Sequence, residues 1–305
     1  ALEIREHVDP HRSKSFDFDM EEIWNGLRAN GNVFCEGLIS DWKTWKDRQG
    51  AEYRMLCDVL PALAPHQEGV VQPADFTQLS VADVREIPTI HTPYGEVPVT
   101  LASAGMKRVL ALAYLIVWAY TKHVSACRLI GTDPTDRFTV LIDEVELHLH
   151  PQWQRTLLPA VLSVIGGMAG ESGAYTGEIE PKVQVIASTH APLVMASVEP
   201  TFNEEIDKVF HFALDNGQVK VEELPWAAQG DAVGWLVSEV FGLEQARSRE
   251  AERAIEAAEA FMRDDLEQVP EALRTKEAIH EELLRVLPGH DPFWPRWVVR
   301  TEQQP

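Results

Sequence analysis

Two short runs of apolar and β-branched residues stand out in this chain, whose remaining hydrophobic positions mostly follow a helical spacing. They are FTVLI at 138–142 and VQVIA at 183–187. Runs this short and this rich in β-branched residues are typical of strands buried in the middle of a sheet. Each run ends on polar residues, Asp143 and Glu144 after the first and Ser-Thr-His (188–190) after the second. We therefore predict two buried central strands of an α/β fold.

Apolar residues at intervals of three and four predict amphipathic helices around these strands. The predicted helices cover residues 16–29, 51–63, 106–124, 152–165, 248–266 and 275–287, the last two packed together. The helix at 106–124 is apolar nearly all round, which predicts that it is completely buried. Turn residues Pro93-Tyr94-Gly95 and Asn216-Gly217 predict two hairpins. Residues 1–15 and the glycine-rich stretch 166–181 are predicted loops.

The composition narrows the class of protein. With 305 residues, 45% hydrophobic and 25% charged, the chain is long enough for one large or two ordinary globular domains. The longest apolar run, 109–120, is shorter than the roughly 20 residues of a membrane span, so we expect no membrane contact. The net charge of −21 argues against a generally basic surface for binding nucleic acid, but it is compatible with a local basic groove or with one that a partner contributes. An odd number of cysteines without metal-type spacing (Cys35, Cys57, Cys127) predicts reduced thiols in the cytoplasm.

The two carboxylates after the first strand are candidate functional groups. Ligands of open α/β sheets bind beyond the carboxyl ends of the strands, where Asp143 and Glu144 are expected. One carboxylate there can hold Mg²⁺ and the other can activate a water molecule. Taken alone, the pattern fits an acidic loop after a core strand equally well.

A second candidate stretch is LASAGMKR, residues 101–108. Gly105 allows the backbone to approach a ligand closely, and Ser103 begins a helix whose free N–H groups favour an anion. Arg108 lies in the first turn, where the helix dipole disfavours a cation, and this placement indicates a contact with phosphate. The simpler interpretation of Ser103 is a helix N-cap.

These stretches together resemble the ATPase heads of the ABC class, especially the RecF/SMC-like and overcoming-lysogenisation-defect-like branch. LASAGMKR resembles the LSxGxxR signature, FTVLIDE the Walker B strand, and ASTHAPLV the strand that carries the switch histidine. ELHLHP resembles the ExHLHP that follows Walker B in that branch. The order agrees as well, because Gly105 precedes Asp143 by 38 residues and His190 follows it by 47. The chain is also similar to bacterial anti-phage ATPases of the Septu and retron type.

The resemblance implies an ATP-binding and hydrolysing subunit that forms a homodimer or higher oligomer around ATP and Mg²⁺. It implies Mg²⁺ binding for Asp143 and catalysis for Glu144 and His190. It also implies that Ser103 and Gly105 contact the nucleotide of the opposite protomer, and Arg108 is expected to bind nucleotide. A nuclease or DNA-processing effector, in anti-phage defence or DNA repair, is the implied partner.

The implied fold is an α/β P-loop NTPase of ABC type without its P-loop half. No GxxxxGK[ST] sequence occurs in the 305 residues, and the resembled family carries it N-terminal to the signature. We expect that half in another part of a longer protein or in a separate polypeptide, and we expect no ATP hydrolysis by this chain alone. The predicted layout is a helical or lid region at 1–96, the ATPase core at 97–224, and a C-terminal helical extension at 225–305.

Two other functions fit the same residues. One is a nucleotide-gated scaffold with little turnover. The other is a metal-dependent hydrolase, because Glu146, His148 and His150 alternate along the chain and could bind zinc together with His190.

Overall fold

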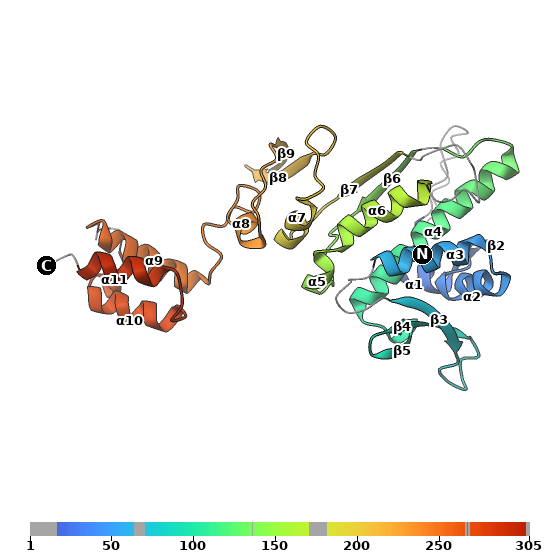
Figure 1. Cartoon of the computed structure of the whole chain (residues 1–305), viewed down its shortest axis with the longest axis horizontal. Helices are drawn as coiled ribbons and strands as arrows, with labels where there is room; N and C mark the ends of the chain where they lie inside the picture. Colours follow the sequence, from blue (N-terminus) through green and yellow to red (C-terminus); the bar gives the residue numbers. More distant parts are fainter. Residues whose placement is uncertain are drawn as a thin grey trace. The chain divides into compact units, whose positions relative to one another are not determined.

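The computed structural model describes residues 17–63, 71–135, 137–170, 182–265, 267 and 269–302. The loop predicted at 1–15 lies outside these residues, as do positions 171–181 of the loop predicted at 166–181. Positions 166–170 correct that prediction, because they belong to the helix Leu157–Gly170. The chain divides into two compact units between Asp207 and Lys208 (Figure 1). The predicted boundaries at 96/97 and 224/225 remain predictions, and the hairpin at 209–224 lies in the second unit.

The described residues of the first unit form helices and three small sheets. Its elements in chain order are α1 (Met20–Asn25), β1 (Leu27–Ala29), β2 (Asn32–Cys35), α2 (Leu38–Arg48), α3 (Ala51–Leu63), β3 (Gln72–Thr77), β4 (Ile87–Thr92), β5 (Gly95–Pro98), the 3₁₀ helix η1 (Val99–Leu101), α4 (Ala104–Ile130), β6 (Arg137–Ile142), α5 (Pro151–Gln154), α6 (Leu157–Gly170), β7 (Lys182–Ala187) and α7 (Pro192–Val198). The predicted hairpin around Tyr94 is confirmed as β4–β5. The single helix predicted at 152–165 is instead two, α5 and α6.

The first helix is shorter than the predicted 16–29. Asp19 and Glu22 cap its start reciprocally, since the Glu22 N–H donates to Asp19 Oδ1 over 2.8 Å and the Asp19 N–H to Glu22 Oε2 over 2.9 Å. Gly26 ends it with φ of 91°, and a Cβ at this position would lie 2.6 Å from the Glu36 carbonyl oxygen. The helical pattern therefore stops where the chain turns into the β1–β2 hairpin.

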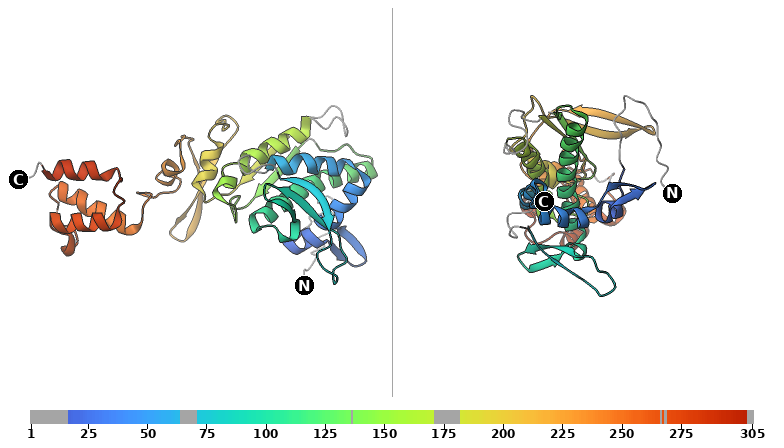
Figure 2. Two further views of the ribbon diagram at one scale, coloured as in Figure 1. Left: turned by 60° about the horizontal axis from the view of Figure 1, so that its bottom comes forward. Right: turned by 90° about the vertical axis from the view of Figure 1, so that its right-hand side faces the viewer.

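The first unit is layered, with helices α4, α6 and α3 between the β6–β7 sheet and the β3–β4–β5 sheet (Figures 1 and 2). Val140, Ile142, Val183 and Val185 pack from β6 and β7 into its core. The α4 rings of Tyr120 and His123 lie 5.8 and 5.9 Å from the Phe138 ring, measured between centroids. The helices thus cover one face of the sheet that carries the candidate carboxylates.

The other face of this sheet is open, which corrects the prediction of two buried central strands. β6 and β7 pair in parallel from Arg137–Lys182 to Ile142–Ala187, and among the described residues no third strand joins them. On the open face the side chains of Leu141 and Ile186 are 74% and 51% exposed. Parallel sheets normally have both faces covered. The apolar runs were interpreted correctly as strands, but the described part of the chain covers only one of their sides.

Helix α4 is longer and less buried than predicted. Ser103 caps its start, and it continues to Ile130, where Leu129 and Ile130 are largely exposed. Its length and composition meet the criterion for a helix that could cross a membrane, but core helices of soluble proteins also meet this criterion. Its buried positions, among them Val109, Leu110 and Tyr114, belong to the core of the first unit.

A polar network lies inside this core. The Tyr114 hydroxyl donates to Asp41 Oδ2 over 2.8 Å and lies 3.0 Å from Cys35 Sγ, while the Trp45 ring stacks on the Tyr114 ring. Asp41 is 6% exposed. Burial raises the pKa of its carboxyl group above the ordinary value, and the bond from Tyr114 offsets this only in part.

We expect this buried carboxyl group to make the stability of the protein fall as the pH rises. The folded state holds the Asp41 proton more tightly than the unfolded chain does, so its contribution is complete below the ordinary pKa of 3.8 and is lost as the pH passes the raised pKa. Asp41→Asn keeps an acceptor for Tyr114 and removes the charge. The free energy of unfolding of this variant minus that of wild type should be larger at pH 7 than at pH 4. The increase should be about 1.4 kcal/mol for each unit by which the pKa of Asp41 is raised. Urea unfolding at both pH values measures this, and a difference that is constant with pH would contradict it.

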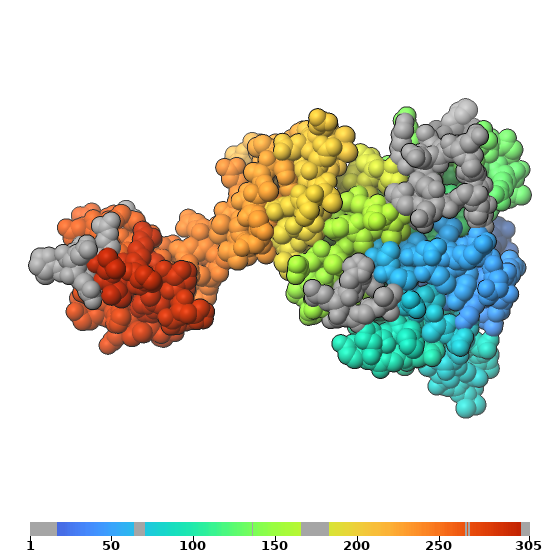
Figure 3. All heavy atoms as spheres, viewed as in Figure 1, coloured from blue at the N-terminus to red at the C-terminus, as the bar shows by residue number. Residues whose placement is uncertain are grey.

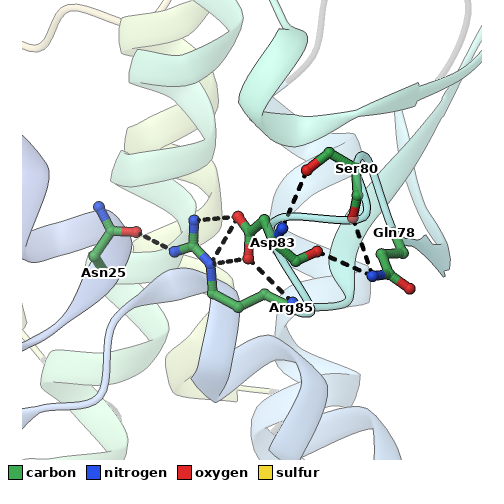
Figure 4. Close-up of polar contacts among 5 residues, drawn as sticks. All are labelled: Asn25, Gln78, Ser80, Asp83 and Arg85. Atoms are coloured by element: carbon green, nitrogen blue, oxygen red, sulfur yellow. Dashed lines mark hydrogen bonds and ion pairs between the residues drawn. The ribbon is translucent and has the colours of Figure 1, made fainter.

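The connection between β3 and β4 is ordered by its own polar groups (Figure 4). Arg85 Nη2 lies 2.7 Å from Asp83 Oδ2, and Arg85 Nη1 donates to Asn25 Oδ1 over 2.8 Å. The hydrogen bonds from Arg85 lower the pKa of Asp83 to about 2. This connection therefore keeps its ion pair throughout the neutral pH range.

The part of the second unit that the structure describes has a hairpin followed by helices. Its elements are β8 (Val209–Asp215), β9 (Gln218–Leu224), α8 (Ala232–Leu236), α9 (Arg249–Met262), the 3₁₀ helix η3 (Glu271–Leu273), α10 (Lys276–Val286) and α11 (Phe293–Glu302). The hairpin predicted at Asn216-Gly217 and the packing of α9 on α10 are confirmed. Side chains of α9, α10 and α11 pack into one body, coloured orange to red in Figure 3. Arg247 and Asp291 pair 2.9 Å apart beside it.

Candidate functional site

The candidate site begins where β6 ends. Asp143 and Glu144 follow Ile142 directly, and Glu144 has a left-handed backbone with φ of 44°. Non-glycine residues adopt this conformation infrequently, and it is more common near functional sites than elsewhere. The turn therefore holds two adjacent carboxylates at the carboxyl end of a parallel strand, as the sequence predicted.

Ser188 connects this turn to the end of β7. Its hydroxyl group accepts a hydrogen bond from the Glu144 N–H over 2.8 Å and donates a short one to Asp143 Oδ1. Backbone bonds reinforce the connection, because the Ser188 N–H donates to the Ile142 carbonyl and the Val145 N–H to the Ser188 carbonyl. Sequence reasoning assigned no role to Ser188. Its position one residue beyond the strand, beside the predicted switch histidine, was the available signal.

Glu146 makes a second connection between the same two segments. Its Oε1 accepts from the His190 backbone N–H over 2.6 Å, and its Oε2 accepts from the Thr189 hydroxyl group over 2.7 Å. The sequence suggested a metal ligand at this position. The structure instead uses both carboxylate oxygen atoms to hold residues 189 and 190.

Arg108 connects the signature-like helix α4 to the carboxylate turn. Its Nη2 donates to the carbonyl oxygens of Asp143 and Glu144, each over 2.8 Å, and its Nη1 donates to that of Leu147 over 3.2 Å. A guanidinium group has five N–H donors, so two remain after these three bonds. The predicted phosphate contact of Arg108 would have to use those two.

Ser103 and Gly105 lie at the start of α4, Ser103 as its N-cap and Gly105 in its first turn. A Cβ at Gly105 would lie 2.7 Å from the His148 carbonyl oxygen, so only glycine fits without movement of the backbone. The Ser103 hydroxyl group is exposed and accepts from the Met106 N–H over 3.3 Å, which is the N-cap arrangement. An exposed cap keeps its hydroxyl group within reach of a ligand from another molecule, and the predicted contact in trans stays a prediction.

The zinc alternative finds no support in the geometry. In the described parts of the chain, which include Glu146, His148, His150 and His190, no group of three or more His, Cys, Asp or Glu side chains is placed to hold a metal ion. His150 Nδ1 accepts from the Gln152 N–H and caps α5. The oxygen donors around Asp143 and Ser188 have the chemistry that Mg²⁺ prefers, with water and a ligand completing its shell.

The hydrogen bonds join the three predicted motifs at one place. Gly105 and Arg108 of the 101–108 stretch contact the segment after β6. Residues 188–190, after β7, form hydrogen bonds with that same segment after β6. This arrangement is a shared edge between two parallel strands and the start of a long helix.

Comparison with known proteins finds a family that matches part of the chain. Residues 75–196, less than half of the chain, match the family described as "AAA domain, putative AbiEii toxin, Type IV TA system". The matched segment contains the signature-like stretch, the carboxylate turn and His190. The predicted resemblance to an ABC-like ATPase is confirmed for this segment, which has a mixed α/β fold.

The relatives that the chain matches include a Septu protein and two probable retron ATPases. Septu protein PtuA of Bacillus thuringiensis is 30% identical over 113 residues, which cover 36% of this chain and 23% of that protein. The retron Vc95 probable ATPase of Vibrio cholerae serotype O1 biovar El Tor is 29% identical over 147 residues, covering 43% and 24%. The retron Ec83 probable ATPase of Escherichia coli is 28% identical over 144 residues, covering 47% and 21%. The matches span about a quarter of the length of these relatives.

A solved structure aligns over a larger share of the chain. It is described under "Structural biochemistry of ATP-driven dimerization and DNA stimulated activation of SMC ATPases". It has a TM-score of 0.35 and 16% identity, and it covers 60% of this chain and 88% of that one.

Proposed function

We propose that this chain supplies the signature, Walker B and switch-histidine part of an ATPase that hydrolyses ATP with Mg²⁺. The observation that carries the proposal is the hydrogen-bonded junction of three sequence motifs. Ser188, Glu146 and Arg108 tie the turn after β6 to the end of β7 and to the start of α4. An acidic loop in a structural role would not require all three segments to meet.

In the proposed reaction, each polar group has one task. Asp143 would hold Mg²⁺, and the bound ion would neutralise charge on the phosphates. Glu144 orients the attacking water and accepts its proton, and His190 hydrogen-bonds the terminal phosphate. The left-handed backbone at Glu144, fixed by Ser188, sets the direction in which this carboxylate leaves the strand end.

A complementary part that contains the P-loop completes the site in this proposal. The sequence lacks GxxxxGK[ST], so the backbone cradle and lysine that hold the phosphates come from elsewhere. The open face of the β6–β7 sheet, with Leu141 and Ile186 exposed, supports the idea that a further layer covers it. Two such assemblies would dimerise around ATP, with Ser103 and Gly105 of one facing the nucleotide of the other.

The biological setting follows by analogy with the relatives. Septu and retron ATPases suggest a role in anti-phage defence, in the cytoplasm, with an effector such as a nuclease or DNA-processing protein. DNA repair is the other setting that the resemblance suggests. A role in anti-phage defence or in DNA repair would be tested in cells, and neither changes the chemistry proposed above.

The direct test is complementation. ATP hydrolysis is measured for this chain alone, for the P-loop-bearing part alone, and for the two together as one polypeptide or a complex. We expect phosphate release only from the combination. Stable ATP-bound assembly without turnover would favour the nucleotide-gated scaffold instead, and absence of both ATP binding and turnover would reject the proposal.

A further inference from the structure

Glu146 continues the connection between the two strands beyond the point where their backbone pairing ends. Backbone hydrogen bonds join β6 and β7 as far as Ile142 and Ser188, and the last of them runs from the Val145 N–H to the Ser188 carbonyl. At His190 the backbone N–H finds no carbonyl from the β6 side. It donates instead to Glu146 Oε1 over 2.6 Å.

The same carboxylate also fixes the residue before the histidine. Glu146 Oε2 accepts from the Thr189 hydroxyl group over 2.7 Å, and Thr189 Oγ1 in turn accepts from the Ala191 N–H over 3.0 Å. Hydrogen bonds to an ionised acceptor are stronger than those between neutral groups. The carboxylate therefore holds the chain on both sides of the point from which the His190 side chain leaves.

The position of Glu146 relative to Glu144 gives this connection a functional meaning. Glu146 is two residues beyond the proposed base, and the Leu149 N–H donates to its carbonyl oxygen over 2.9 Å, which fixes its own backbone. His190 is exposed at the end of β7. A link from 146 to 190 thus sets the distance between the group that activates water and the group that contacts the terminal phosphate.

We propose that Glu146 is a positioning residue that holds His190 in register with Glu144, an inference that rests on the proposed function. It acts through hydrogen-bond acceptance at both oxygen atoms and takes no part in proton transfer or metal binding. A glutamine can take over this task. Its Oε1 accepts from the His190 N–H, and its Nε2 donates to the Thr189 hydroxyl group, which can accept as well as donate.

The connection itself is tested on this chain without nucleotide, by amide hydrogen exchange. Glu146→Ala should speed exchange of the His190 amide by about tenfold, the effect of one lost hydrogen bond. Glu146→Gln should leave it within about twofold of wild type. The Val194 amide, bonded to the Ala191 carbonyl, is the internal reference. Equal acceleration at both amides would show general loosening and overturn the proposal, as would an unchanged His190 amide in Glu146→Ala.

The catalytic consequence is tested in the ATP-hydrolysing combination with the P-loop part. Glu146→Ala should lower kcat by about 100-fold with little change in ATP affinity, because a displaced group impairs the reaction more than binding. Glu146→Gln should restore most of the activity. Inactivity of Glu146→Gln would show that the charge itself is required and would overturn the proposal, as would an unaltered kcat in Glu146→Ala. If the wild-type combination does not hydrolyse ATP, the proposed function fails, and amide exchange still decides whether the connection exists.

Discussion

Replacement of Glu144 by glutamine is expected to lower ATP turnover of the completed assembly by at least about 100-fold, the usual contribution of a general base. Glutamine has nearly the same shape but cannot accept a proton from water. The Ser188 hydroxyl group holds residue 144 through its backbone N–H, so the substitution leaves that contact in place. ATP binding and ATP-dependent assembly should therefore persist, and the variant should accumulate in the bound state.

Phosphate release and light scattering after size-exclusion chromatography measure the two parts of this expectation. The exposed Glu204→Gln provides a control with the same chemical change away from the site. Equal turnover in Glu144→Gln and wild type would reject Glu144 as the catalytic base. Loss of ATP binding together with turnover would mean that the carboxylate acts in binding.

The second large effect is expected from Gly105→Ala. In an ordinary helix this change stabilises by about 0.5–1 kcal/mol. At Gly105 the added Cβ would meet the His148 carbonyl oxygen at 2.7 Å, a backbone atom in a segment that Arg108 also holds at Leu147. Forced crowding of this kind costs about 1–3 kcal/mol, so we expect the free energy of unfolding to fall by about 1–2 kcal/mol.

Urea unfolding of the chain measures this effect without any ligand. Gly289→Ala is the matched control, because a Cβ there would meet no atom within 4 Å. Its stability should stay close to wild type. A Gly105→Ala variant as stable as the control would show that the contact between the start of α4 and the 145–150 segment is loose.

The sequence predicted the elements that make up the site better than it predicted their surroundings. The apolar runs at 138–142 and 183–187, the start of a helix at Ser103 and the packing of α9 on α10 are local patterns with a clear period, and the structure has them. The open face of β6–β7 could not be predicted, because Leu141 and Ile186 have the same residue types whether or not another layer covers them. Whether a strand is buried depends on the elements that pack on it as well as on its own residues.

The site itself shows the same division. Motif order placed Asp143, Glu144 and His190 at neighbouring strand ends, since parallel strands end at one edge. The partners of Arg108 and Glu146 depend on side-chain directions in two turns, including left-handed residues at 144 and 148, and no periodic pattern encodes these. The sequence therefore suggested a phosphate contact for Arg108 and, in the zinc alternative, a metal for Glu146, but it could not show which protein atoms these side chains bond.

The uncovered side of β6–β7 also has a practical consequence. A short parallel pair that exposes hydrophobic side chains, and that no other strand joins in the described part of the chain, is a template on which other copies can align. Preparations of this polypeptide by itself should form aggregates as concentration rises, and co-production with the region that carries the phosphate loop should suppress them.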